Sequence, residues 1–223
     1  MQVPSEVPVM TLSNAILFPQ AMLPLHIFEP RYRKMLADVL AGTRVFAVAL
    51  RRGDRVRETP ASVAGLGLVR ACVTRPDGTS NLILQGLTRI RLGRAVQYRP
   101  YRVHTVQPLP PAGNSGLVVQ ALTLRVLELA KNRLQQGLHS FVQSPPEPPG
   151  SAPVTLEAFQ QALEHLAQLD DAEQLTDLVS ATLLRDPRQR QIILETPRLE
   201  DRLRYLVRFL QSNTEESADS DEE

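Results

Sequence analysis

The sequence predicts an α+β protein in which a β-barrel carrying one helix is followed by a C-terminal α-helical bundle. Between residues 44 and 106 the apolar side chains follow a strand-like period, and after a Pro-rich break at 108–113 they recur at helical spacing. Apolar residues make up 43% of the chain and include no Trp, so Leu, Val, Ile and Ala must fill the core. Several short strands around one helix favour a closed or partly closed barrel.

The chain begins with a strand and a helix. The side chains of residues 7–12 alternate, and turn formers lie at both ends of this segment, which predicts the first strand. Pro30 suits the first helical position, where its missing N–H costs nothing, and Gly42 supplies the stop. The predicted apolar face of this helix consists of Met35, Leu36, Val39 and Leu40.

Two strands and a hairpin follow this helix. Residues 45–50 predict a buried strand, and residues 63–74 predict a second one. Within it, Gly65 and Gly67 indicate a bulge or a close backbone approach. The turn formers Pro76-Asp77-Gly78 then join 63–74 to a strand at 81–85.

The barrel region ends with further alternating residues. Ile90 and Leu92 are expected to face the core, whereas Arg89 and Arg91 are expected to face water. The alternation continues through residues 101–106.

Helices are expected in the rest of the chain. The first has an apolar face and ends near Gly137, and the last runs over residues 199–210 with an exterior Glu200–Arg204 pair. The apolar face of the first consists of Leu117, Ala121, Leu124, Leu127 and Ala130. Capping patterns predict further helix starts at Thr155, Asp171, Asp186-Pro187 and Thr196-Pro197.

These elements predict two domains and a tail. Residues 1–112 would form the barrel, and residues 113–212 the helical bundle, with a Pro-rich connector at 144–153. Residues 213–223 carry a net charge of −6 and no apolar side chain larger than Ala, so we expect a disordered acidic tail.

Composition excludes several classes of protein. The single Cys72 cannot form an internal disulfide, and the chain has neither a signal-like start nor an apolar run long enough for a membrane span. We therefore expect a cytoplasmic protein with no membrane association. Residues 1–113 carry a net charge of +9. Two explanations fit this charge: a compositional bias toward Arg, or an Arg-rich surface that binds carboxylates or phosphates.

One run of residues resembles a known family. The segment Leu23-Pro24-Leu25-His26-Ile27-Phe28-Glu29-Pro30-Arg31-Tyr32, preceded by Leu17-Phe18-Pro19, is similar to the opening of the Lon protease N-terminal domain. The similarity extends over residues 7–212, including Gly65-Leu66-Gly67, residues 84–89 and the helical half from Asp171 to Leu210. The resemblance implies a PUA-like β-barrel followed by a helical bundle, in a module that engages unfolded or tagged polypeptides.

No catalytic motif accompanies this resemblance. A Walker A loop needs Gly-Lys, but Lys34 follows Arg33 and Lys131 follows Ala130. The four His residues share no metal-ligand spacing, and Gly65-Leu66-Gly67 leads into a strand instead of the helix that a dinucleotide site requires. The sequence therefore predicts a protein that is not an enzyme, with no catalytic residue, metal or cofactor.

The leading functional prediction is a Lon-domain protein that stands without ATPase or peptidase domains and binds unfolded or extended polypeptides. It would serve as an adaptor or holdase for a protein partner such as a separate AAA+ protease, and its oligomeric state stays open. The residues proposed to contact the partner are His26, Phe28, Arg31 and Tyr32. For Arg31 and Tyr32 a structural role, tying the helix to the barrel, is the favoured alternative.

RNA binding is the second functional prediction. A mixture of cations and rings between residues 89 and 102 has the composition of a single-strand binding surface, and polar outward faces of strands have the same composition. The residues concerned are Arg89, Arg91, Tyr98, Arg99, Tyr101 and Arg102.

Overall fold

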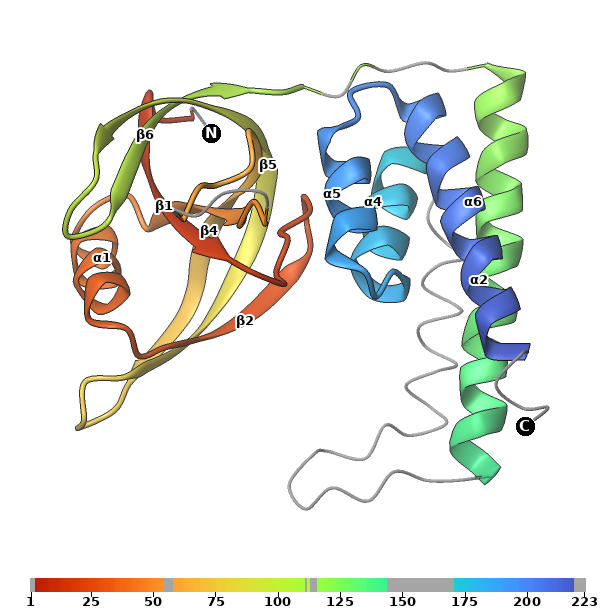
Figure 1. The fold of residues 1–223 in the computed structure, drawn as a ribbon, viewed down its shortest axis with the longest axis horizontal. Coiled ribbons are helices and arrows are strands. Elements are labelled where there is room, and N and C mark those ends of the chain that lie inside the picture. The colour runs from red at the N-terminus through yellow and green to blue at the C-terminus, as the bar shows by residue number, and fades with distance from the viewer. Residues whose placement is uncertain (1–2, 54–57, 111, 113–115, 144–170, 219–223) are drawn as a thin grey trace. The chain divides into compact units, whose positions relative to one another are not determined.

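The computed structural model describes residues 3–53, 58–110, 112, 116–143 and 171–218 (Figure 1). By its internal contacts the chain divides into two compact units. The first combines Met1–Pro111 with Arg185–Pro197, and the second combines Ala112–Leu184 with Arg198–Glu223.

The first unit is built on one mixed sheet. The described strands pair in the order β2-β5-β4-β3-β1-β6, and β5 also pairs with β6, so five strands form a circuit to which β2 is added at the edge. Among the described strand pairs, β1 and β3 are parallel and all the others are antiparallel. The strands are β1 (Glu6–Leu12), β2 (Met22–Ile27), β3 (Val45–Leu50), β4 (Val63–Thr74), β5 (Ser80–Gln97) and β6 (Arg102–Pro108). A mixed class of strands and helices is confirmed, while the PUA-like barrel stays a prediction.

Two strands differ from the sequence-based prediction. No strand was predicted for residues 22–27, but β2 pairs with β5 from Met22 to Ile27. Pro24 is tolerated there because β2 is an edge strand, so the missing N–H can point away from the ladder. β5 is one strand of 18 residues instead of two short ones, because its first part pairs with β2 and β4 and its second part with β4 and β6.

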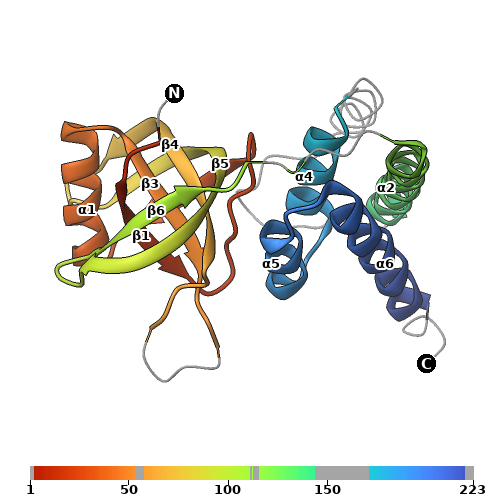
Figure 2. The same cartoon turned by 90° about the horizontal axis from the view of Figure 1, so that it is seen from above.

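The predicted helix is α1 (Pro30–Ala41), with Pro30 in its first turn. It lies along one side of the strands (Figure 2). Its buried side chains are Tyr32, Met35, Leu36 and Val39, which pack with strand residues such as Phe46 and Leu84 in one core cluster. Gly42 follows the helix without a positive φ, and Arg44 takes the left-handed conformation instead, with φ of 59°.

Glycines let the chain cross the sheet closely, as the sequence predicts. A Cβ added at Gly65 would lie 2.0 Å from the carbonyl oxygen of Leu17, and one at Gly86 would lie 1.9 Å from that of Phe18. The backbone of residues 17–18 therefore lies directly against β4 and β5. The β4–β5 pairing also shifts register between Leu66 and Gly67, where a bulge was expected, and between Val69 and Ala71, where none was.

The helix α5 (Pro187–Glu195) corrects the expected domain boundary. Its segment groups with the strands and not with the helical bundle predicted over 113–212. Part of the physical reason is a buried hydrogen bond in which Gln191 Nε2 donates to the carbonyl oxygen of Val63 in β4, at 2.9 Å. A bond between residues so far apart in sequence cannot be deduced from local patterns.

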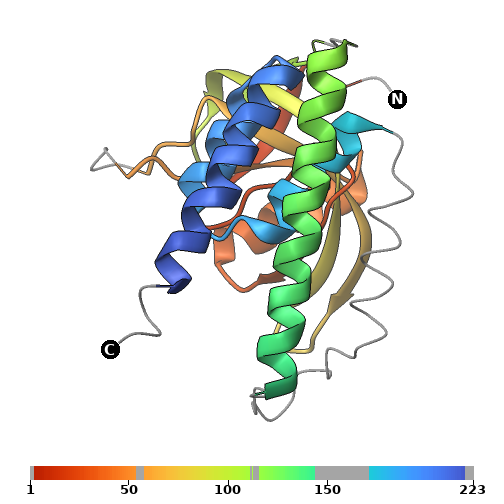
Figure 3. The same cartoon turned by 90° about the vertical axis from the view of Figure 1, so that its right-hand side faces the viewer.

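The second unit contains the described helices α2 (Leu117–Gln143), α4 (Ala172–Leu183) and α6 (Leu199–Ala218), and α2 and α6 pack side by side (Figure 3). Arg202 of α6 has only 1% of its surface exposed and forms ion pairs with Glu173 and Asp177 of α4. Asp171 caps α4 as predicted, by accepting a hydrogen bond from the backbone N–H of Glu173.

Three predictions about the helical half are wrong. α2 continues past Gly137 to Gln143. Thr196 ends α5 instead of opening the last helix, because its hydroxyl donates back to the carbonyl oxygen of Ile192. α6 extends to Ala218 across residues expected to be disordered, since a helix already formed adds further turns at little cost. The connector at 144–153 and the helix expected at Thr155 lie outside the described residues, as do residues 219–223.

Candidate functional site

The outward side of β2 is the starting point of the candidate site. Met22, Pro24 and His26 are exposed, and they alternate with Leu23, Leu25 and Ile27, which pack in or against the core cluster of α1. The period of two in a strand produces this separation, with one row of side chains buried and the next in solvent.

Strand register brings further side chains beside this row. Pro24 pairs with Ile83 of β5, which pairs with Ala71 of β4. In the next row, His26 pairs with Asn81, which pairs with Val73. Three strands thus contribute to one surface, which we call the β2 face, and Figure 1 shows β2 and β5 running together. The β2 face consists of Met22, Pro24, His26, Phe28, Ala71, Val73, Asn81 and Ile83.

The β2 face is unusually apolar for an exposed surface. The exposed fractions are 58% for Met22, 61% for Phe28, 67% for Val73 and 36% for Ile83. Single exposed apolar residues are common in soluble proteins, but several on one sheet face indicate a surface that binds a partner.

A hollow of about 450 Å³ lies on this face, lined by residues 24–26, 71–73 and 81–83. At its rim, Nδ1 of His26 lies 2.7 Å from Oδ1 of Asn81, and the His26 ring stacks on Phe28 with ring centroids 5.9 Å apart. When Nδ1 donates this hydrogen bond, Nε2 of the neutral ring is left as an acceptor. The hollow therefore combines apolar walls with polar groups that can bond a peptide backbone.

Arg31 and Tyr32 belong to a neighbouring ionic cluster. Arg31 Nε lies 2.9 Å from Glu29 Oε2, and Arg31 Nη1 lies 2.8 Å from Glu58 Oε2. The guanidinium also lies 4.4 Å from the centre of the Tyr32 ring. Burial lowers the pKa of Arg31, but the hydrogen bond with Glu58 raises it and the net direction is upward. These contacts hold the start of α1 to the loop that contains Glu58.

Tyr32 cannot contact a partner as the sequence analysis proposed, because only 4% of its surface is exposed. Its hydroxyl donates to the carbonyl oxygen of Thr11 at 3.1 Å and accepts from the Thr11 N–H at 3.0 Å. Burial, the largest cause, raises the pKa of this phenol. Of the four proposed contact residues, the structure brings only His26 and Phe28 into the hollow or beside it.

The residues proposed for RNA do not form one free surface. Arg89 is buried, with 6% exposed, although it was expected to face water. Tyr101 donates its hydroxyl to Asp38, and Arg102 donates to the carbonyl oxygen of Glu58 while lying 5.4 Å from the Tyr98 ring centre. Arg91, Tyr98 and Arg99 are exposed as expected. Because half of the set is engaged or buried, the structure gives RNA binding no support.

Sequence reasoning missed Met22, Val73, Asn81 and Ile83. A signal for Ile83 was present, because it lies between the buried Leu82 and Leu84, and three consecutive apolar residues in a strand must place one on the opposite face. The others could not be grouped without the register of three strands. Among the described residues, no cluster of three or more His, Cys, Asp or Glu side chains is placed to hold a metal ion.

Comparison with known proteins identifies the family. Residues 6–212 match the sequence model of the ATP-dependent protease La (LON) substrate-binding domain. The chain belongs to the LON substrate-binding domain family.

Sequence relatives of this LON domain are whole proteases. Lon protease 2 of Herpetosiphon aurantiacus is 26% identical over 205 residues, which are 90% of this chain and 23% of that protein. Lon protease 2 of Syntrophobacter fumaroxidans is 26% identical over 93% of this chain and 24% of that protein. The chain thus spans about a quarter of the length of the proteases that it matches.

Solved structures agree with the fold of this LON domain. The N-terminal domain of the Mycobacterium avium complex Lon protease superposes with a TM-score of 0.72 at 18% identity, covering 92% of this chain and 98% of that one. A Lon N-terminal domain protein from Xanthomonas campestris gives a TM-score of 0.61 at 20% identity, covering 92% and 99%. None of the described helices is long and apolar enough to cross a membrane.

Proposed function

We propose that this LON domain recognises unfolded or extended polypeptide segments and that the β2 face holds their apolar side chains. Membership of a substrate-binding family supports the general role. The observation that carries the specific proposal is the exposure of Met22, Phe28, Val73 and Ile83 on the β2 face, where Val73 and Ile83 line the hollow and Phe28 stacks on His26 beside it. Burial of such side chains by a partner removes apolar surface from water and favours binding.

The mode of binding proposed is capture of side chains, not addition of a strand to the sheet. Strand addition requires a free edge with a regular row of N–H and C=O groups. β2 is an edge strand in the described sheet, but Pro24 in its middle has no N–H to donate. The hollow beside Pro24 accepts an apolar side chain, and His26 and Asn81 offer hydrogen bonds to the backbone of the bound segment.

The module would act without catalysis of its own, as an adaptor or a holdase. An adaptor delivers its cargo to a separate AAA+ protease, whereas a holdase only delays aggregation. Purified protein mixed with a permanently unfolded model polypeptide and such a protease separates the two roles. Faster degradation of the polypeptide supports the adaptor, and delayed aggregation with unchanged degradation supports the holdase.

The β2 face itself is tested by the double variant Phe28→Ser, Val73→Ser. Both side chains are more than half exposed, so the substitutions should leave the fold intact. We expect the Kd for a fluorescently labelled unfolded polypeptide, measured by anisotropy, to rise at least tenfold, or about 1.4 kcal/mol.

The matched control is Leu124→Ser on α2, where the side chain is 68% exposed, compared with 67% for Val73. This control should bind as the unsubstituted protein does. Equal weakening by the control, or no binding by the unsubstituted protein, would contradict the proposal.

A further inference from the structure

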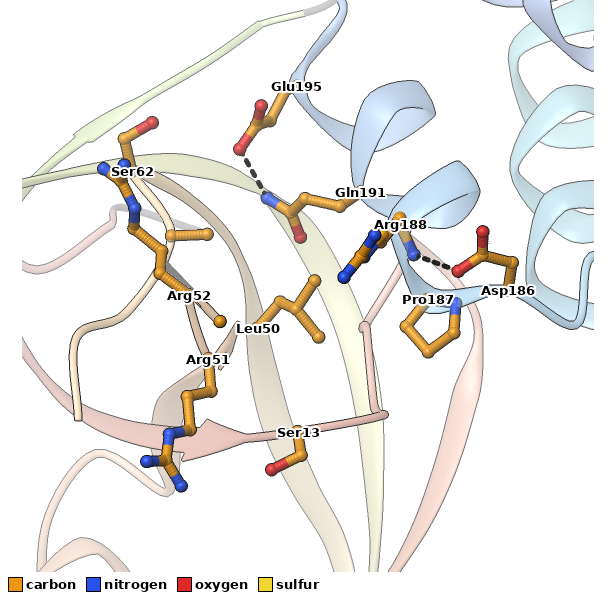
Figure 4. A pocket seen from close by; sticks show the side chains of 12 residues that line it. Ser13, Leu50, Arg51, Arg52, Ser62, Asp186, Pro187, Arg188, Gln191 and Glu195 are labelled. Carbon is orange, nitrogen blue, oxygen red and sulfur yellow. Dashed lines mark hydrogen bonds between the residues drawn. The ribbon is translucent and has the colours of Figure 1, made fainter. Parts of the chain in front are cut away.

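A second cavity, of about 710 Å³, lies within the first unit and apart from the β2 face. The end of β3 and the loop after it form one side, and α5 forms the other (Figure 4). The volume lies in the range of ordinary ligand sites. Its most informative residues are Leu50, Arg51, Arg52, Arg188, Gln191 and Glu195.

Gln191 gives this cavity a hydrogen-bond acceptor without a partner. The residue is buried, with 8% of its surface exposed. Its Nε2 donates to the carbonyl oxygen of Val63 at 2.9 Å and to Glu195 Oε1 at 2.7 Å, so both amide protons are used and the orientation of the amide is fixed. Oε1 is buried and has no hydrogen-bond partner among the described residues. Figure 4 shows this oxygen directed into the cavity.

Buried polar groups in proteins are nearly always hydrogen-bonded. An unpartnered buried acceptor at a cavity therefore indicates that a bound molecule supplies the donor. The cavity wall offers serine hydroxyls and guanidinium groups as donors, and the guanidinium groups favour a molecule that carries negative charge. Arg51 and Arg188 are exposed and lie on opposite sides of the cavity, and Arg52 is a third cation on its wall.

The two carboxylates beside the cavity already have partners. Asp186 accepts the backbone N–H of Arg188 at 2.8 Å as the cap of α5, and Glu195 accepts from Gln191. Of the described residues, three arginines and two carboxylates line the cavity, so its wall carries net positive charge and attracts an anion, and planar guanidinium groups bind carboxylates in a bidentate way. Leu50, Ala61 and Pro187 add apolar wall.

We propose that this cavity binds an acidic polypeptide segment. An Asp or Glu carboxylate of the segment lies against Arg51 or Arg188, and a backbone N–H donates to Oε1 of Gln191. This inference rests on the proposed function, because it names an additional class of cargo: acidic segments, taken at a site other than the β2 face.

The test uses the full chain and two short peptides that differ only by an Asp in one and an Asn in the other. We expect the Asp peptide to bind at least tenfold more tightly by calorimetry, with an affinity that falls as salt is raised. The double variant Arg51→Gln, Arg188→Gln should remove this preference. The control Arg91→Gln changes an exposed cation of β5 outside the cavity and should keep it.

Gln191 is tested through the ligand, because a substitution there would also break the bond to Val63. N-methylation of successive amides of the Asp peptide should weaken binding at one position. Equal binding of the Asp and Asn peptides, or no sensitivity to any N-methyl group, would overturn the proposal. Acetate or phosphate binding as tightly as the peptide would overturn it too, because the arginines would then hold an anion only.

Failure of this proposal is distinguishable from failure of the proposed function. The Phe28→Ser, Val73→Ser variant should still prefer the Asp peptide, since neither residue lines the cavity. If an apolar unfolded polypeptide binds through the β2 face but the Asp and Asn peptides bind equally, only the acidic-segment site is wrong. If neither the polypeptide nor the peptides bind, both proposals are wrong.

Discussion

Single residues show how much of the candidate site was accessible from sequence. His26 and Phe28 could be named because they lie in the most distinctive segment of the chain, and they do lie at the hollow. Tyr32 was named for the same reason, but it is buried. Position in a motif indicates importance, and it does not distinguish a contact residue from one that supports the fold.

Tyr32 should act on stability and not on binding. Tyr32→Phe removes the donor to the Thr11 carbonyl and the acceptor for the Thr11 N–H, so we expect a loss of about 1–3 kcal/mol in the free energy of unfolding. Urea denaturation at neutral pH measures this loss. The Kd for the unfolded polypeptide should be unchanged in conditions where the variant is folded, and a tenfold weaker Kd would return Tyr32 to the contact residues.

The pH dependence of unfolding gives Tyr32 a second test. Its pKa in the folded protein is raised above the value of about 10 that an unfolded chain shows, with burial as the main cause. Above that pH the unfolded state loses the proton first, so the free energy of unfolding falls as pH rises. This fall should be shallower in Tyr32→Phe. Tyr98→Phe, at a 67% exposed ring, is the control and should follow the unsubstituted protein.

At the scale of elements, local signals fixed most of the strands and helices but not their partners. Pro30 and the turn at Gly78, where φ is 79°, are local features and were predicted correctly. Arg89 was misplaced because the alternation rule assumes that one face of the strand is exposed to solvent, whereas Arg89 and its neighbour Ile90, which point to opposite faces, are both buried. The predicted apolar face of α2 is wrong in part: Ala130 is buried as predicted, but Leu117 and Leu124 are exposed, and Val119 and Val126 are buried instead.

The crossing of residues 17–18 over β4 makes Gly65 indispensable to the fold. Gly65→Ala would place a methyl group 2.0 Å from the Leu17 carbonyl oxygen, and because that atom is backbone, a side-chain rotation cannot relieve the clash. We expect a loss of about 3 kcal/mol in the free energy of unfolding, measured by urea denaturation. Gly53→Ala is the control, because its Cβ would meet nothing within 4 Å, and it should change stability by less than about 0.5 kcal/mol. Equal losses in the two variants would show that the close approach is absent.

For the whole molecule, the order of strands followed by helices was evident, but the discontinuous first unit was not. Composition and periodicity change at about residue 112, and the compact units also divide there. α5 has the same capping pattern as its helical neighbours, with Asp186 as N-cap and Pro187 in the first turn. Nothing local marks its membership of the strand unit, which depends on contacts with β4 such as the bond from Gln191 to Val63.

This discontinuity predicts that a fragment ending at residue 112 is an incomplete first unit. Without α5, the carbonyl oxygen of Val63 loses its donor from Gln191, and the cavity beside Arg51 loses a wall. A fragment of residues 1–112 should therefore unfold at a lower urea concentration than the same fragment carrying residues 185–197 on a flexible Gly/Ser linker. The control carries the same segment with Gln191→Ala, which removes both hydrogen bonds of the amide and should recover only part of the difference. Equal urea midpoints for all three fragments would mean that α5 belongs with the helices, as the sequence alone suggested.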